Sequence, residues 1–314
     1  MNKLIRMILV LVGWQGSLAV AAESGLARGE HDIDLKDVRL HYAVRGQGPV
    51  LFVTSPGWGI GSNYLQSSLT PLEQTFTVVY IDTRGSGGSS RPADRSRMSK
   101  GDMADDIDEL RERLGLPHID LLGHSDGGTI AIEYGLRHRQ RARKLVLIAP
   151  AVIGDNETEM TSAFLKAWTS DPRYADAVKE VRESDWDHPG FTDEEFARSL
   201  VTILPLYFSD PSRQVPAFIK AHMTGSRPSA WAYQASSAAS DNVSKDQAAA
   251  AGLIEARTLI VNGTVDWICP YPVAQRLHAA IPDSQLRIYA NTGHFPWIEQ
   301  PPRFFAEVTK FLQQ

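Results

Sequence analysis

Cysteine is almost absent from this chain of 314 residues, which contains Cys269 alone. A single thiol cannot form an intramolecular disulfide, so no crosslink within the chain can support the fold, and we expect Cys269 to be a buried spectator. Basic residues are also outnumbered, with 32 Lys and Arg against 37 Asp and Glu and a net charge of −5. That balance disfavours nucleic acid and anionic membrane surfaces as partners.

The sequence also lacks the motifs of cofactor and metal proteins. We find no nicotinamide fingerprint, no phosphate-binding glycine loop and no cluster of metal-ligating residues, so neither a cofactor nor a metal is expected. There is no internal repeat, and the only low-complexity stretch is the alanine run at 248–251. With 43% hydrophobic and 22% charged residues, the composition is that of an ordinary globular protein long enough to bury a large core.

The first 22 residues have the pattern of a secretory signal. Lys3 and Arg6 precede an apolar stretch, and the small residues at 19–21 fit a cleavage site. Glycine and glutamine interrupt the apolar stretch at 13–16, so a permanent membrane span is not expected. We therefore predict that residues 1–22 are a signal peptide and that the protein is secreted or periplasmic.

A serine held between glycines is the most informative feature that is present. Gly123-His124-Ser125-Asp126-Gly127 follows the apolar run 119–122 and precedes the helix-like segment 129–134. A strand, a glycine-flanked serine and a helix are typical of a nucleophile elbow, a tight turn that presents the serine hydroxyl at the carboxyl edge of a sheet. The alternative is a glycine-rich turn with a solvent-exposed serine.

Two partners for the serine follow in the order Ser, Asp, His. Asp266 lies just beyond a strand predicted at 258–263, and His294 lies beyond a second predicted strand at 286–289. The carboxyl ends of parallel strands build the sites of such sheets. We predict Ser125 as nucleophile, His294 as general base and Asp266 as the acid that orients the imidazole.

Other residues compete for these roles. Asp155, beyond a strand predicted at 145–149, is the alternative acid, and Asp266 could be an ordinary turn residue. His124 is expected to pack beside the nucleophile rather than act as the base. His188 and His222 are possible substrate contacts.

An oxyanion hole requires two N–H donors near the nucleophile. We predict one from the backbone of Asp126, the residue after the serine, and one from Trp58. Trp58 lies in the glycine-rich loop 55–62 that follows a predicted strand at 50–53. The alternative for this loop is a plain flexible turn.

The remaining pattern predicts an α/β protein. Alternating apolar residues at 33–44 indicate an antiparallel hairpin, and 78–81 reads as a buried strand. Apolar residues recur with helical spacing at 101–114 and 304–312. Strands that alternate with helices predict a mostly parallel, doubly wound sheet.

Between 151 and 252 the alternation stops, and prolines divide an aromatic-rich stretch into short helices. We predict a helical cap here, inserted between two core segments at 23–150 and 253–314 and lying over Ser125. The predicted substrate pocket has seven members: Gly57, His124, Trp186, Tyr207, Phe208, Trp231 and Phe295.

From residue 32 to residue 311 the chain resembles the α/β-hydrolase family, most closely its proline-iminopeptidase-like branch. The resemblance depends on four segments: SPGWG at 55–59, YIDTRGSGGSSRP at 80–92, the elbow, and GHFPWIEQP at 293–301. True prolyl iminopeptidases usually have HGGPG in the oxyanion loop and GGSWG at the elbow, and this chain differs at both. Epoxide hydrolases and haloalkane dehalogenases use an aspartate nucleophile, which Ser125 argues against.

The family resemblance implies a serine hydrolase with an acyl-enzyme intermediate on Ser125. Its substrate would be a small molecule or short peptide with an ester, lactone or amide bond. One alternative is a proline-releasing aminopeptidase whose cap carboxylates bind the free amine, with five available: Glu183, Asp185, Asp187, Glu194 and Glu195. Others are an acyltransferase or perhydrolase and a non-catalytic ligand-binding protein.

Overall fold

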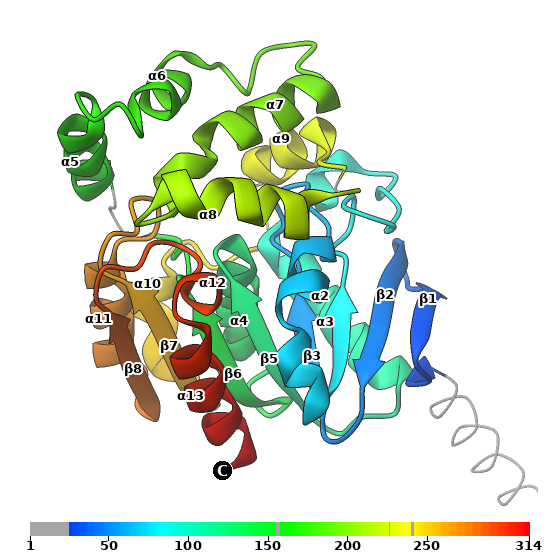
Figure 1. Cartoon of the computed structure of the whole chain (residues 1–314). Coiled ribbons are helices and arrows are strands. Elements are labelled where there is room, and N and C mark those ends of the chain that lie inside the picture. Colours follow the sequence, from blue (N-terminus) through cyan, green and yellow to red (C-terminus); the bar gives the residue numbers. More distant parts are fainter. Residues whose placement is uncertain (1–24, 155–157, 226, 240–241) are drawn as a thin grey trace, which may run out of the picture.

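The computed structural model describes residues 25–154, 158–225, 227–239 and 242–314 (Figure 1). The predicted signal peptide and Asp155 lie outside these ranges. Eight strands form one sheet: β1 (Gly29–Asp34), β2 (Arg39–Gly46), β3 (Val50–Thr54), β4 (Thr77–Ile81), β5 (Ile119–His124), β6 (Ala142–Ile148), β7 (Arg257–Gly263) and β8 (Ser284–Tyr289).

The strand order in the sheet is β1-β2-β4-β3-β5-β6-β7-β8. Strands β1 and β2 form an antiparallel pair, and β2 runs antiparallel to β4. Every other neighbouring pair is parallel. The predicted mostly parallel sheet and its opening hairpin are therefore confirmed.

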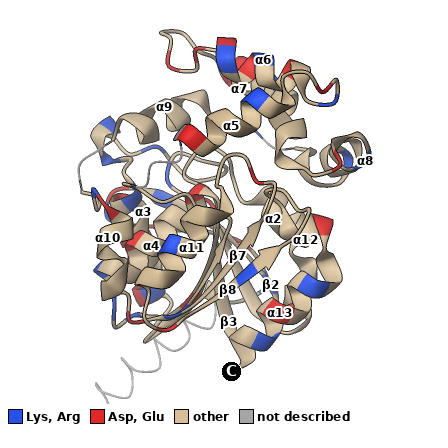
Figure 2. Ribbon diagram, turned by 90° about the vertical axis from the view of Figure 1, so that its left-hand side faces the viewer, with Lys and Arg blue, Asp and Glu red and all other residues tan. Residues whose placement is uncertain are grey.

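Helices cover both faces of the sheet: α2 (Asn63–Ser68), α3 (Lys100–Arg113), α4 (Asp126–Arg137), α11 (Tyr271–Ala280), α12 (Pro296–Glu299) and α13 (Pro301–Gln313). Short turns of 3-10 helix lie at η1 (Thr70–Gln74), η2 (Arg95–Arg97) and η5 (Ala251–Leu253). Figure 2 shows the acidic and basic residues mainly on the outward faces of these helices.

Successive residues of a strand contribute to two separate cores. In β3, Leu51 and Val53 belong to one buried cluster and Phe52 to the other. This follows from the alternation of side chains across a strand. Helices α3, α4 and α11 pack on the Phe52 side, while α2 and α13 pack on the Leu51 side. Because both faces are covered, the central strands are buried along nearly their whole length.

The described part of the connection from β6 to β7 begins with five helices and two irregular turns: α5 (Thr158–Trp168), α6 (Ala175–Glu183), α7 (Asp193–Ile203), η3 (Leu204–Tyr207), α8 (Pro211–Phe218), the π-helical η4 (Ile219–Met223) and α9 (Ala230–Ala238). Figure 1 shows them above the carboxyl ends of the parallel strands. A sixth short helix, α10 (Gln247–Ala250), packs on α4, where Gln247 Nε2 donates to Thr129 O at 3.0 Å. We refer to the segment from α5 to α9 as the cap.

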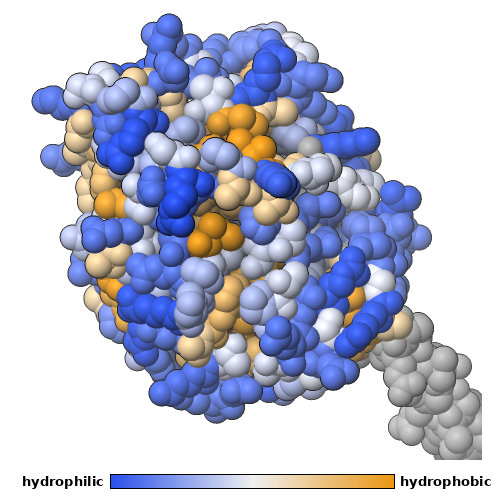
Figure 3. Space-filling view, viewed as in Figure 1, coloured by the Kyte–Doolittle hydropathy of each residue, from blue (hydrophilic) through white to orange (hydrophobic). Residues whose placement is uncertain are grey.

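Cap residues such as Phe196 and Leu206 are continuous with the core cluster that includes Leu51. In the view of Figure 3 the surface is mostly hydrophilic, with apolar groups gathered near the cap. Within the described residues, only Val201 and Leu253 are large hydrophobic side chains that are clearly exposed. None of the described helices is long and apolar enough to cross a membrane.

Candidate active site

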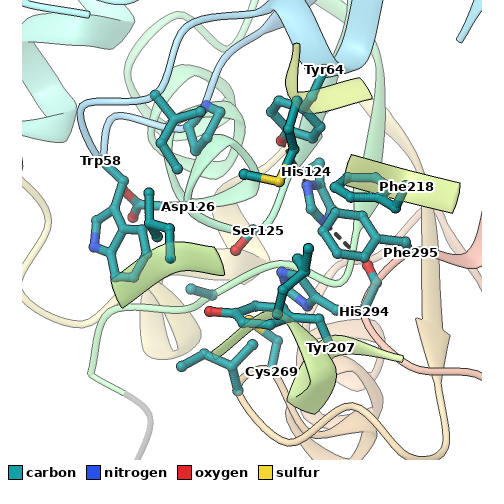
Figure 4. Close-up of a pocket in the computed structure, with 17 residues that line it drawn as sticks. Trp58, Tyr64, His124, Ser125, Asp126, Tyr207, Phe218, Cys269, His294 and Phe295 are labelled. Carbon is teal, nitrogen blue, oxygen red and sulfur yellow. Dashed lines mark hydrogen bonds between the residues drawn. The ribbon is translucent and has the colours of Figure 1, made fainter. Parts of the chain in front are cut away.

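Ser125 occupies a strained turn between β5 and α4. Its φ of 57° and ψ of −123° lie outside the regions that L-residues normally adopt. Gly123 is required here, because a Cβ at that position would lie 2.1 Å from the carbonyl oxygen of Gly127. The Ser125 N–H donates to Ile148 O on β6 at 2.9 Å, which fixes the turn to the sheet. The serine side chain lines a cavity beneath the cap (Figure 4).

Asp266 and His294 come together at the same sheet edge, from the loops after β7 and β8. His294 Nδ1 lies 2.8 Å from Asp266 Oδ2, and both side chains are buried. The other carboxylate oxygen, Oδ1, accepts the backbone N–H groups of Ile268 and Cys269. A carboxylate held in this way accepts a hydrogen bond from Nδ1–H, which leaves Nε2 of His294 free to act on a neighbour. Figure 4 shows His294 next to Ser125 on the cavity wall.

His124 packs directly behind the reactive side chains. Its Nε2 lies 3.0 Å from the carbonyl oxygen of His294, and its Nδ1 lies 2.8 Å from the Tyr64 hydroxyl. Because a carbonyl can only accept, Nε2 carries the proton and Nδ1 accepts from Tyr64. Burial lowers the pKa of His124 well below its usual value, and the neighbouring His294 lowers it further. His124 is therefore a weak base, and both of its ring nitrogens are already hydrogen-bonded, so it does not serve as the general base.

The two predicted oxyanion donors come from two separate segments of the chain at the cavity wall. Asp126 is the first residue of α4, and Trp58 follows β3. Among the described residues, neither backbone N–H has a hydrogen-bond partner. The loop is fixed to the cap, because Ser229 N–H donates to Gly59 O at 2.8 Å. Both N–H groups are therefore available to a ligand.

A second network connects the histidine loop with the cap. The His294 N–H donates to Tyr207 O at 2.8 Å. Glu299 accepts the N–H of Gly293 at 2.6 Å and the N–H of Ser209 at 3.1 Å. Burial raises the pKa of Glu299, while these accepted hydrogen bonds act in the opposite direction. The loop that carries His294 is thus held from the cap side as well as from the core.

The cavity has a volume of about 320 Å³ and a mostly apolar wall. Its described lining comprises Pro56, Trp58, Ile60, Tyr64, His124, Ser125, Asp126, Ala151, Leu200, Leu204, Tyr207, Phe218, Met223, Ile268, Cys269, His294 and Phe295. This lining contains no Lys or Arg, and Asp126 is its only carboxylate. No group of three or more potential metal ligands occurs among the described residues.

Three of the predicted pocket residues, His124, Tyr207 and Phe295, line this cavity. Figure 4 shows Tyr207 and Phe295 on the side of the cavity where His294 lies. The Tyr207 hydroxyl has no hydrogen-bond partner among the described residues, and burial raises its pKa. It is therefore a polar group available to a ligand within an apolar wall.

The other four predicted pocket residues do not reach the cavity. Gly57 packs against Met103, and Trp186 packs edge-on against Trp58. Phe208 lies behind Phe295, with ring centroids 5.1 Å apart.

Trp231 is covered by the guanidinium of Arg91. His222, a possible substrate contact, instead bonds Ser67. His188 lines a separate surface depression with Trp186. The structure therefore does not bring these residues to the described lining of the cavity that contains Ser125.

Sequence reasoning missed most of the apolar lining and the role of Tyr64. The spacing of Leu200 and Leu204, four residues apart, places both on one helical face and could have identified them. Tyr64 gave no such signal, because its partner His124 is 60 residues away.

Comparison with known proteins agrees with this geometry. A model of the alpha/beta hydrolase fold family matches residues 49–301, more than half of the chain. The chain is 26% identical over 288 residues to a 2-hydroxymuconate semialdehyde hydrolase of Pseudomonas putida, covering 86% of each chain.

Solved structures show the same fold. An alpha/beta fold family hydrolase from Bacillus anthracis superimposes with a TM-score of 0.72 at 19% identity, over 90% of this chain and 98% of the other. An enol-lactonase from Burkholderia xenovorans gives a TM-score of 0.69 at 22% identity, over 90% and 100%. The chain belongs to the alpha/beta hydrolase fold family and is a serine hydrolase.

Proposed function

We propose that this protein hydrolyses small, uncharged carboxyl esters or lactones through an acyl-enzyme on Ser125. The observation that carries the proposal is the cavity wall, which joins the serine and histidine to apolar side chains and has no cation among its described members. Its volume of about 320 Å³ lies at the small end of the range for ligand pockets.

The proposed reaction assigns one role to each of the clustered groups. Nε2 of His294 takes the proton from the Ser125 hydroxyl as the serine oxygen attacks the ester carbon. Asp266 holds the proton on Nδ1 and stabilises the imidazolium that forms. The N–H groups of Trp58 and Asp126 stabilise the developing oxyanion. His294 then protonates the leaving alcohol. In the second half of the reaction, His294 takes a proton from a water molecule, which attacks the acyl-enzyme and releases the acid.

The charge of the wall separates this proposal from its alternatives. A substrate with a carboxylate would need a cation on the wall, because an unpaired buried charge is costly. A substrate with a free amine would need an available carboxylate, and that of Asp126 is paired with Lys100.

Of the five cap acids that could bind an amine, Asp185 and Glu195 line the separate surface depression rather than this cavity. Glu183, Asp187 and Glu194 are absent from both linings. These placements favour ester over aminopeptidase chemistry.

The names of two similar structures support the ester class. One similar structure is an esterase from Exiguobacterium antarcticum, with a TM-score of 0.63 at 22% identity. Another is the enol-lactonase described above. Both reactions attack an acyl carbon that carries an oxygen leaving group, as proposed here.

The test uses p-nitrophenyl esters of increasing acyl length beside proline p-nitroanilide and an anionic hemisuccinate ester. We expect turnover of short neutral esters, at least about tenfold lower kcat/KM for the hemisuccinate, and loss of activity in Ser125→Ala. Dominant turnover of the anilide would instead support the aminopeptidase. No turnover and no labelling of Ser125 by a fluorophosphonate would support a binding protein. Acyl transfer to an added alcohol in preference to water would support an acyltransferase.

Export is a second part of the proposal. Residues 1–22 have the charged start, apolar stretch and small-residue site of a signal peptide. We expect the protein recovered from the periplasm or medium to begin near residue 22 or 23. Recovery of the full chain in the cytoplasm would contradict this.

A further inference from the structure

Lys100 has an unusual position at the first residue of α3. The helix is capped by Ser99, whose hydroxyl accepts from the N–H of Asp102 while Asp102 bonds back to Ser99. A cation in the first turn faces the positive end of the helix dipole, which is unfavourable. The Lys100 side chain is mostly buried, with 13% of it exposed. Its position is therefore explained only by the partners of its ammonium group.

Those partners come from three segments that surround the catalytic serine. Nζ lies 2.5 Å from Asp126 Oδ2, with a geometry of an ion pair rather than an aligned hydrogen bond. It donates to Ser236 Oγ on α9 at 2.6 Å and reaches Gly57 O at 3.5 Å. The Lys100 ammonium group thus connects Asp126, Gly57 and the cap helix α9.

An unpaired Asp126 carboxylate would repel the negative charge that develops during the proposed reaction. The Asp126 N–H is the proposed oxyanion donor, so its carboxylate lies one residue from Ser125, on the wall where negative charge develops. Two negative charges in a cavity with a mostly apolar wall repel more strongly than they would in water. Pairing with Lys100 cancels the charge of the side chain and leaves the N–H dipole to act on the oxyanion.

We propose that Lys100 is a positioning residue that acts through Asp126, by neutralising the carboxylate beside the proposed oxyanion donor. The inference rests on the proposed function, because it requires an oxyanion to form at Ser125. Lys100 itself is not part of the described cavity lining and does not touch the reacting atoms. Its effect is therefore expected in kcat rather than in KM.

The test measures the second-order rate at which a fluorophosphonate labels Ser125 in the full chain. In that reaction the serine oxygen bonds to phosphorus, its proton passes to His294, fluoride leaves, and the phosphonyl oxygen occupies the oxyanion hole. We expect Lys100→Met to slow labelling by about 50-fold, somewhat less than removing an oxyanion donor outright. Lys100→Arg keeps the charge and should lose less than about fivefold.

The decisive variant is the double change Lys100→Met with Asp126→Asn. Removing both charges should recover labelling to within about fivefold of the wild type, because no unpaired anion remains. If the bridge acted only as a structural tie, the double variant would be as slow as Lys100→Met, and the proposal would be overturned. Should Lys100→Met fail to fold, the Arg variant and the double variant still decide the question.

A matched control is Lys179→Met, which removes an exposed lysine 3.9 Å from Glu183 on α6. Its labelling rate should equal that of the wild type. With a p-nitrophenyl ester, Lys100→Met should lower kcat while KM changes less than about threefold. Absence of labelling in the wild type would refute the proposed function itself. Equal labelling of the wild type and Lys100→Met would refute only the role of Lys100.

Discussion

Replacing His124 by Gln should change how the stability of the protein depends on pH. In the folded protein His124 is fully buried and neutral, with Nε2 donating to His294 O and Nδ1 accepting from Tyr64. Its pKa is well below the ordinary value of 6.5 because of burial. Gln can keep the donor to the carbonyl oxygen but does not titrate.

The sign of this pH dependence follows from which state of the chain, folded or unfolded, binds the proton. Above pH 6.5 the imidazole is neutral in both the folded and the unfolded chain, so it contributes no pH dependence. Below pH 6.5 the unfolded chain binds a proton that the folded chain excludes, and the free energy of unfolding falls. Between pH 7.5 and pH 5.5 this loss is about 1.4 kcal/mol for a group with an unfolded pKa near 6.5.

The assay is urea unfolding of the wild type and His124→Gln at pH 7.5, 6.5 and 5.5. Gln leaves the Tyr64 hydroxyl without its acceptor, which costs about 1–3 kcal/mol at every pH. The informative quantity is therefore the difference between the two proteins, in which other titrating groups cancel. That difference should shrink by about 1.4 kcal/mol from pH 7.5 to pH 5.5. Parallel pH profiles would show that His124 binds its proton equally well in the folded and the unfolded chain, and the assigned network would be incorrect.

Three further predictions concern catalysis. Asp266→Asn should lower kcat on a p-nitrophenyl ester by about 10³–10⁴-fold, because Nδ1 of His294 loses its carboxylate; a loss below tenfold would indicate another acid, such as Asp155. Met223→Ala should move the preferred acyl chain to longer lengths, because Met223 is a half-buried part of the cavity wall; an identical chain-length profile would show that the acyl group lies elsewhere. Tyr207→Phe should lower kcat/KM for lactones by about 5–10-fold without lowering Tm, because its hydroxyl has no described protein partner to lose; equal kcat/KM values would remove Tyr207 from substrate recognition.

The fold could be predicted because its signals are local. The apolar runs of β5 and β7, and the helical spacing of Met103, Ile107 and Leu110, depend only on neighbours in the chain. The same is true of the elbow, where Gly123 is required by a contact with Gly127, four residues away. Asp266 and His294 were located by their positions after strands, and parallel strands bring such positions to one edge.

The cavity wall was harder to predict, because it depends on how the cap helices are oriented. Trp186 and Trp231 are large aromatic residues of the cap, yet one packs on Trp58 and the other on Arg91. Smaller residues such as Met223 and Ile268 line the cavity instead. Residue size and hydrophobicity indicate burial, but they do not distinguish a core position from a pocket position.

Lys100 was missed for a different reason. A lysine beside the charged residues that open α3 has the pattern of a solvated helix end, and its partners lie 26 and 136 residues away. Polar contacts between residues far apart in the chain produce no periodic pattern in the sequence. They become visible only when the elbow, the oxyanion loop and α9 are placed together.

The cap contributes to the position of the base as well as to the shape of the pocket. The His294 N–H is bonded to Tyr207 O, and Glu299 joins Gly293 to Ser209, so the segment from η3 to α8 holds the loop from above. His124 holds the same loop from the elbow side through the carbonyl oxygen of His294. A shift of this cap segment would therefore move Nε2 relative to Ser125. Misplacement by about 1 Å can cost on the order of 100-fold in rate. Changes in the cap at 207–209 should accordingly lower kcat and not only alter substrate preference. Helices α5 and α6 contribute no residue to the described lining of the cavity, so changes there should affect kcat less.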